Sequence, residues 1–412
     1  MQITPPLLPH LAFYEALAVL DESNSAWSET VAGLLTLRLF DTWGEMVRRG
    51  ERVQAWEVTG VAEAVDELPE THPARAALRA VVEAVRTPDA APAAALTHLS
   101  NYARALRFDA QWLLAADVFA TMLSNAYGAP DDLVISAAYH RGYCLRMAGH
   151  LDAAAASYDE GRAIAASCGN EAGLLEADVS HAALALHRGN LPAAETLLDG
   201  VIRRANPATC GRVLARALHD RATVAARRGS PEEAAVYGYR ALALFETGAD
   251  RDRVLSDLAA ALGDAGQYDA AWDALLVLAG TAEEQEVRWV ATVNLTELAT
   301  VRGDERLFDQ FRAQLADAAL PAWLTAHFEL SVGCGAHRFG RRAAAIEALR
   351  NAVRVATQYG VNEVRVRAEV LLTAIEREPT GDRVGEGAVS SQLAEVLSGV
   401  RALRELTGVN PG

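Results

Sequence analysis

Few side chains in this sequence have the type and spacing that covalent chemistry requires. The chain of 412 residues carries 38 basic residues, and because it contains no lysine, all 38 are arginine. This rules out lysine general bases, Schiff-base lysines and phosphate-binding loops that depend on lysine. The sequence also lacks an HExxH motif, a GxSxG motif and a GxGxxG loop after a strand. We therefore expect a protein that is not an enzyme and that uses no cofactor.

One group of side chains has a spacing that a metal site could use. His327, Cys334 and His337 are separated by seven and three residues, so they would share one face of a helix. A tetrahedral site needs a further ligand from a neighbouring helix, and the sequence offers no candidate. The four cysteines are widely separated and form no CxxC pair. We expect no metal and no disulfide framework.

The charge balance bears on the partners of the protein. With 54 acidic against 38 basic residues the net charge is −16, which disfavours nucleic acid and anionic membranes, because both require clustered positive charge. No run approaches 18 uncharged apolar residues, and the N-terminus lacks the basic region of a signal peptide. We expect a cytoplasmic protein. The lysine-free, alanine- and arginine-rich composition indicates a GC-rich bacterial source.

The elements that position these side chains are predicted to be helices. Hydrophobic residues make up 51% of the chain but aromatic residues only 6%; alanine is abundant and β-branched runs are scarce, which favours an all-α fold. A helix, a turn and a second helix recur at intervals of 37 to 40 residues. The turn residues are Ala110, Gly149, Gly189, Gly229, Gly266, Gly303 and Gly340.

Small residues flank each turn at fixed distances. One stands seven positions before the turn and another five positions after it, with Thr296 and Phe308 as the larger exceptions. Small residues at these positions let the two helices of a pair approach closely. Phe308 therefore predicts that the pair around Gly303 is splayed. At another turn, Gly229 is followed by Ser230 and Pro231, which are typical of an N-cap and a first helical position.

The best-formed unit runs from Tyr139 to Ala163. Its residues Gly142, Gly149, Leu151, Ala154 and Tyr158 have a spacing that resembles a tetratricopeptide repeat. The resemblance implies a right-handed α-solenoid of helix-turn-helix repeats whose first helices line a concave groove. The sequence departs from the usual period of 34 residues, and the proline near the end of each unit is mostly missing.

The composition divides the chain into four segments. We expect a divergent N-terminal helical cap over residues 1–91 and an array of about seven repeats over residues 92–375. A polar, glycine-rich linker is predicted over residues 376–388, and an amphipathic helix and tail over residues 389–412. The last helix, Val389–Leu406, is either a cap packed on the array or a tethered segment. In the second case it docks on a partner, on a second copy or in its own groove.

The resemblance also implies which side chains face the groove. They stand 13, 10, 6, 3 and 2 positions before each turn residue, and in this chain they are rich in arginine with interleaved aromatic rings. The predicted binding residues are Arg104, Arg107, Phe108, Tyr139, Tyr143, Arg146, Arg216, His219 and Arg253. Arginine forks hold carboxylates or phosphates in two hydrogen bonds. Solvated arginines, or salt bridges between neighbouring units, are the alternative interpretation.

Two functions fit this pattern. The first is a non-enzymatic adaptor or scaffold that binds a partner protein or peptide, acidic or extended, in its groove. The second is a ligand-responsive sensor that binds a peptide or a small anionic ligand and regulates an effector. The second resembles in general design the bacterial peptide sensors built on tetratricopeptide superhelices.

Overall fold

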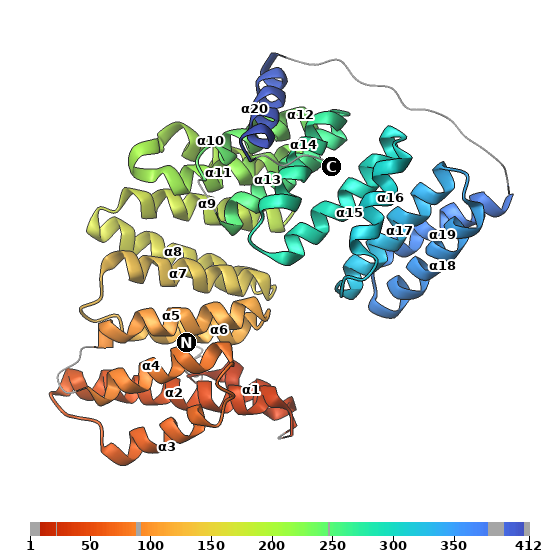
Figure 1. The fold of residues 1–412 in the computed structure, drawn as a ribbon. Helices are drawn as coiled ribbons and strands as arrows, with labels where there is room; N and C mark the ends of the chain where they lie inside the picture. The colour runs from red at the N-terminus through yellow and green to blue at the C-terminus, as the bar shows by residue number, and fades with distance from the viewer. Residues whose placement is uncertain (1–8, 22, 88–91, 246–247, 378–390, 408–412) are drawn as a thin grey trace, which may run out of the picture. The chain divides into compact units, whose positions relative to one another are not determined.

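The chain folds into helices joined by short turns. A computed structural model describes residues 9–21, 23–87, 92–245, 248–377 and 391–407. Within these ranges there are twenty α-helices and no strand, so the protein is an all-α solenoid, as the sequence predicts (Figure 1). The chain divides into two compact units, Met1–Val213 and Leu214–Gly412. Most of the predicted linker, from residue 378 on, lies outside the described residues, as does the tail after residue 407.

The first unit holds ten whole helices. They are α1 (Leu11–Val19), α2 (Ser25–Arg49), α3 (Ala55–Asp66), α4 (Pro73–Arg86), α5 (Pro92–Phe108), α6 (Trp112–Ser124), α7 (Asp131–Met147), α8 (Leu151–Cys168), α9 (Glu171–His187) and α10 (Leu191–Arg204). From α1 to α10 each helix packs on the next one in the sequence. Helix α1 also contacts α6, so it lies on the first pair of the predicted array.

The second unit continues the series. Its helices are α12 (Pro231–Leu242), α13 (Ala249–Asp264), α14 (Tyr268–Thr281), α15 (Gln285–Arg302), α16 (Glu305–Leu315), α17 (Ala322–Arg338), α18 (Arg342–Tyr359), α19 (Asn362–Arg377) and α20 (Ser391–Thr407). Helix α11 (Pro207–Arg227) crosses the boundary between the units and is interrupted by non-helical backbone at Cys210.

All seven predicted turn residues adopt the left-handed backbone conformation. The six glycines have φ between 72° and 83°, and Ala110 has φ of 55°. After each of them the next residue donates its N–H to the carbonyl four residues before the turn, at 2.7–3.0 Å. This hydrogen bond closes a helix C-terminus in the Schellman arrangement. After Gly229, Ser230 is the N-cap of α12 as predicted, but its side chain makes no capping hydrogen bond.

The small residues before the turns stand where helices cross closely. A Cβ added at Gly142 would lie 2.3 Å from the Tyr158 ring, and one at Gly333 would lie 2.6 Å from Leu349. Each glycine therefore makes room for a large side chain on the second helix of its own pair. This close contact explains why a small residue stands seven positions before each of these turns.

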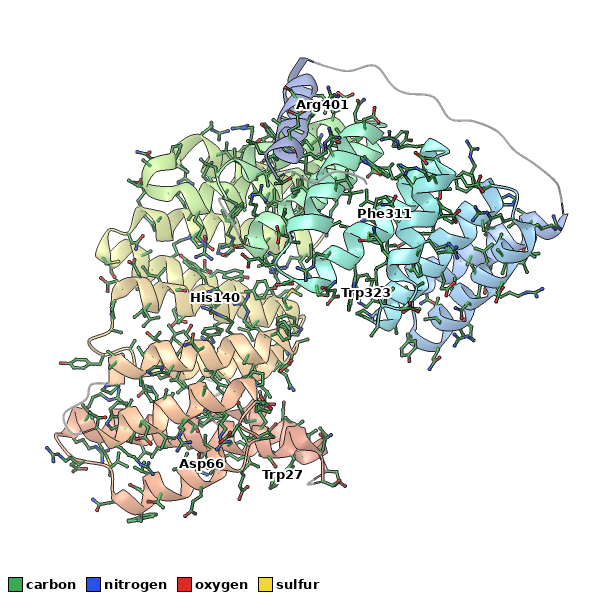
Figure 2. The ribbon with its side chains drawn as sticks, in the orientation of Figure 1. Trp27, Asp66, His140, Phe311, Trp323 and Arg401 are labelled. Atoms are coloured by element: carbon green, nitrogen blue, oxygen red, sulfur yellow. The ribbon has the colours of Figure 1, made fainter. Side chains whose placement is uncertain are left out.

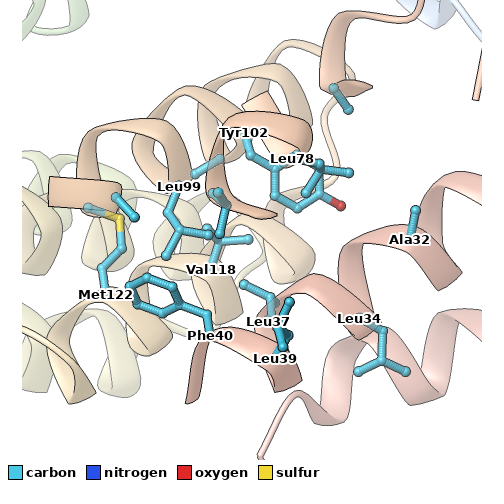
Figure 3. Packing of buried hydrophobic residues seen from close by; sticks show 14 of the residues in the cluster. Ala32, Leu34, Leu37, Leu39, Phe40, Leu78, Leu99, Tyr102, Val118 and Met122 are labelled. Carbon is cyan, nitrogen blue, oxygen red and sulfur yellow. The ribbon is translucent and has the colours of Figure 1, made fainter. Parts of the chain in front are cut away.

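The core of the first unit runs without a break from Phe13 to Cys144. In Figure 3, Leu37 and Phe40 of α2 face Leu99 of α5 and Val118 of α6. One hydrophobic cluster thus joins helices on both sides of residue 91. The division between cap and array at that residue stays a prediction.

The first helices of neighbouring pairs lie side by side in both units. Helix α7 contacts α9 more closely than α8 contacts α10, and α15 contacts α17 more closely than α16 contacts α18. Between α5 and α10 and between α15 and α18, the first helices therefore form the shorter, inner side of the stack. Side chains on this side are the ones that the resemblance assigns to binding.

The pair around Gly303 accommodates its large residue. Phe308 is 1% exposed, and a Cβ at Gly335 would lie 2.1 Å from its ring, so a glycine on α17 makes the space that Phe308 fills. Helix α17 still packs more closely on α15 than on α16.

None of the described helices has both the length and the apolar character needed to cross a membrane.

Candidate binding face on the first helices

Two arginines and a tyrosine form a cluster on the inner side of the first unit. Arg107 comes from the last turn of α5, and Tyr143 and Arg146 come from α7. The guanidinium carbon of Arg107 lies 4.6 Å from the centre of the Tyr143 ring, and that of Arg146 lies 5.2 Å from it. Both cations thus rest on one aromatic ring, an attraction worth about 0.5–2 kcal/mol for each arginine.

The repeat register explains why these residues meet. Arg107 stands three positions before the turn at Ala110, and Arg146 stands three positions before the turn at Gly149. They occupy the same position in consecutive pairs, so packing of α5 beside α7 brings their side chains to one face. We call Arg107, Tyr143 and Arg146 the arginine–tyrosine cluster.

Neighbouring rings hold the cluster in place. His140 stacks on Phe119 of α6 with ring centres 5.5 Å apart, and its Nδ1 accepts a hydrogen bond of 3.1 Å from Arg107. The Trp112 ring packs edge-on against Tyr143 at 5.9 Å. Figure 2 labels His140 on α7. The sequence did not single out His140, Phe119 or Trp112, because none stands at a groove position of the resembling family.

The cluster differs from other arginines of the chain in its electrostatics. Neither Arg107 nor Arg146 forms an ion pair with a carboxylate among the described residues. The Nε atom of each is buried without a protein hydrogen-bond partner in the described chain. In contrast, Arg221 lies 4.7 Å from the Tyr237 ring centre but pairs with Glu233 at 2.8 Å.

A buried thiol lies near the cluster. Burial raises the pKa of Cys144 to about 12, and the positive charge of Arg107 opposes that rise. Such a thiol stays protonated at neutral pH and is not a nucleophile. The cluster therefore offers cation and aromatic contacts rather than covalent chemistry.

The other predicted residues of the first unit are placed differently. Arg104 is exposed on α5, and Phe108 is 87% exposed at the end of the same helix. Tyr139 is only 6% exposed, and its hydroxyl donates to the Gly173 carbonyl at 2.8 Å. Tyr139 therefore packs in the core between α7, α8 and α9, and its ring is not on the binding face. The space for it comes from Gly161, where a Cβ would lie 2.7 Å from the Tyr139 ring.

The remaining predicted residues belong to the second unit. His219 donates from Nε2 to Asp257 at 2.7 Å, and Arg253 pairs with Asp250 at 3.4 Å. Arg216 is half-buried on α11. A cleft of 460 Å³ opens beside His219, where Asp257 and Asp264 bring negative charge to its wall. In the second unit, carboxylates thus lie beside the basic residues that were expected to give the groove its positive charge.

The residues with metal-ligand spacing do not form a metal site. A search of the described residues found no group of three histidine, cysteine or acidic side chains that could hold an ion. His327 is partly buried, and burial lowers its pKa. Burial also raises the pKa of Cys334. All four cysteines are free thiols.

Comparisons with known proteins add little to this picture. No family model matches the chain, and no curated protein matches it. Solved structures that are similar to it include the following two. The crystal structure of BtubC (BKLC) from P. vanneervenii covers 80% of this chain and 99% of its own, at 14% identity and a TM-score of 0.29. A circular tandem repeat protein with novel repeat topology and enhanced subunit contact surfaces covers 95% and 89%, at 16% identity and a TM-score of 0.20. Likenesses this weak carry no inference about function.

Proposed function

We propose that this protein is a non-enzymatic adaptor that holds an acidic, extended segment of a partner protein on the first helices of its N-terminal unit. The observation that carries the proposal is the arginine–tyrosine cluster. Its two guanidinium groups are positioned by an aromatic ring and not by carboxylates of the described chain. Apart from the buried Nε atoms and the hydrogen bond from Arg107 to His140, their N–H groups are available to an acidic ligand.

Preorganisation makes these arginines suited to binding. A guanidinium on an aromatic face has lost part of its rotamer freedom before the ligand arrives, so less entropy is lost on binding. A hydrogen bond to a charged group contributes roughly 1.5–3 kcal/mol. Two such forks, with the exposed Arg104 and Phe108 beside them on α5, can fix one or two carboxylates of an extended chain.

The net charge adds selectivity. A protein of charge −16 repels acidic segments over most of its surface, so attraction is confined to local cationic patches. An acidic segment bound elsewhere would meet like charge. The cluster therefore fixes where such a segment binds.

A fluorescence anisotropy titration tests the proposal. The probe is a labelled twelve-residue peptide of alternating glutamate and leucine, with a glutamine-for-glutamate peptide as the uncharged counterpart. We expect the glutamate peptide to bind more tightly. We expect Arg107→Ala and Arg146→Ala each to weaken it about tenfold, which corresponds to about 1.4 kcal/mol.

The matched control is Arg203→Ala. Arg203 is an exposed arginine on α10 of the same unit, so its removal makes the same change in net charge without touching the cluster. Equal losses for Arg107→Ala and Arg203→Ala would show that the effect is only global charge. Unchanged affinity in the Arg107→Ala, Arg146→Ala double variant would refute the proposed site.

A further inference from the structure

The last helix, α20, packs within the second unit. It packs on α12 and α14, the second helices of two consecutive pairs (Figure 1). Leu393, Val396 and Val400 of this helix are buried, at 0%, 2% and 0% exposure. Their spacing of three and four residues places them on one stripe of the helix.

The surface under α20 is shaped and charged to receive it. A Cβ at Gly399 would lie 1.9 Å from the Tyr239 hydroxyl, so the helix touches α12 closely at that point. One turn further on, Arg404 donates to Asp273 of α14 at 2.6 Å. The Asp273 side chain is only 7% exposed, so the ion pair is shielded from water. Arg401, labelled in Figure 2, lies on the same helix.

Helix α14 requires such a cover. With α20 in place, every residue from Ala270 to Leu278 is buried, and Asp273 is the one charged residue among them. An outer helix of a solenoid ordinarily has one exposed face, and a helix that is apolar all round is covered on every side. Helix α20 covers the side that the array leaves open.

The fit of α20 itself is incomplete. Leu406, at the end of the predicted apolar stripe, is 85% exposed. Helix α20 also follows α19 in sequence, yet Val366 and Val370 on α19 remain 49% and 66% exposed. The chain therefore directs its last helix to α12 and α14 rather than to the exposed valines of the preceding helix. Contacts of this kind depend only on the helix that arrives, not on the chain to which it belongs.

We propose that the outer face of α12 and α14 is a binding site for an amphipathic helix of a partner protein, and that α20 is an internal ligand occupying it. The partner helix has apolar residues at positions i, i+3 and i+7 and an arginine or lysine at i+11. These match Leu393, Val396, Val400 and Arg404. The cation recognises Asp273, and the apolar residues cover α14.

Tethering sets the threshold for such a partner. A short linker holds an internal ligand near its site at an effective concentration on the order of millimolar. A free helix of equal intrinsic affinity therefore cannot displace α20 at micromolar concentration. A partner binds either because its contacts are better or because α20 has been released.

The test uses the full chain and a labelled peptide of residues 391–407 as the probe. Val396→Asp with Val400→Asp places charges on the buried stripe of α20 and releases it. We expect the peptide to bind this variant at least about tenfold more tightly than the wild-type chain. The control is Val366→Asp with Val370→Asp, which makes the same charge change on exposed positions of α19 and should leave peptide binding at the wild-type level.

A second variant and a second peptide keep the test decisive. Gly399→Leu releases α20 by a clash with Tyr239 and adds no charge, so it replaces the first variant should that one lose its helical circular dichroism. A peptide with Arg404→Glu should bind at least about tenfold more weakly, because it places a carboxylate beside Asp273. Absence of peptide binding to both released variants would overturn the proposal. Concentration-dependent dimers of the wild-type chain that disappear in the released variants would also overturn it, because the occupant would then be a second copy.

Discussion

The turn at Ala110 holds an alanine in a backbone conformation that glycine adopts more easily. Its φ of 55° is in the left-handed region, which costs an alanine about 1–2 kcal/mol. Glycine removes that strain but loses more entropy on folding, by about 0.5–1 kcal/mol. We expect Ala110→Gly to stabilise the protein by up to about 1 kcal/mol, seen as a higher urea midpoint.

The paired control is Gly149→Ala at the equivalent turn of the next pair, where φ is 83°. This change should lower the urea midpoint, because it introduces the strain that Ala110→Gly removes. The same direction of shift in both variants would mean that backbone strain does not set the stability of these turns.

Sequence and structure agree on turn residues and differ on a groove residue. The turns could be predicted because a left-handed residue and a fixed spacing are local properties of the chain. Tyr139 could not be placed, because its burial depends on space left by Gly161 of α8 and on the Gly173 carbonyl of α9. Helical register predicts which side of a helix a residue takes, but not how deeply its ring enters the interface.

At the scale of elements, the pair around Gly303 shows how one large residue is compensated. The Phe308 ring fills the space beside Gly335, which lies on the next first helix, so two chain positions must change together. We expect Gly335→Ala to cost about 1–3 kcal/mol by overpacking, and Phe308→Ala to cost about 3–5 kcal/mol by leaving a cavity. In the double variant the added methyl enters that cavity. Its cost should be at least about 1 kcal/mol below the sum of the two single costs.

Urea unfolding of the four chains of this cycle measures the coupling. Gly263→Ala is the control, since no other residue lies within 4 Å of a Cβ at Gly263 in α13, and alanine there should stabilise the helix. Strict additivity of Gly335→Ala and Phe308→Ala would contradict the packing described for α16 and α17. Phe308 alone does not reveal this compensation, because Gly335 lies 27 residues away in the sequence (335 − 308).

The sequence of α14 already indicated that another helix would cover it. Its sequence has no polar face apart from Asp269 and Asp273, which is unusual for an outer helix of an array. A cover was therefore required, although the pattern alone does not say which segment supplies it. The Asp273 carboxylate within the apolar stretch indicated that the covering segment would carry a cation.

At the scale of the whole molecule, charge sets the solution behaviour. The sequence has an isoelectric point of about 5.1 and a net charge of −16 at pH 7. Repulsion between molecules weakens as the pH falls and the carboxylates take up protons. We expect minimum solubility near pH 5, measured as a maximum of light scattering between pH 4 and pH 8. A maximum near pH 7 would show that apolar surface, and not net charge, controls association.

The positions of the turns between helices could be predicted from the sequence, whereas the position of the last helix could not. The repeat spacing is a local property of the sequence, and each helical pair contacts mainly its neighbours. The ion pair between Arg404 and Asp273 joins residues 131 positions apart, and no local pattern specifies such a partner. For the same reason the amphipathic stripe of residues 389–406 was compatible with several docking sites.

The docking of α20 on α12 and α14 also affects the order in which the chain folds. Local contacts let consecutive helical pairs form as they leave the ribosome, since each pair needs only the one before it. Helix α20 cannot dock until α12 and α14 are in place and residues through Thr407 have been synthesised. Until then the largely apolar α14 lacks its cover. The α14 surface that α20 covers is thus an apolar surface that stays exposed until synthesis ends, and it is a surface that a chaperone could bind.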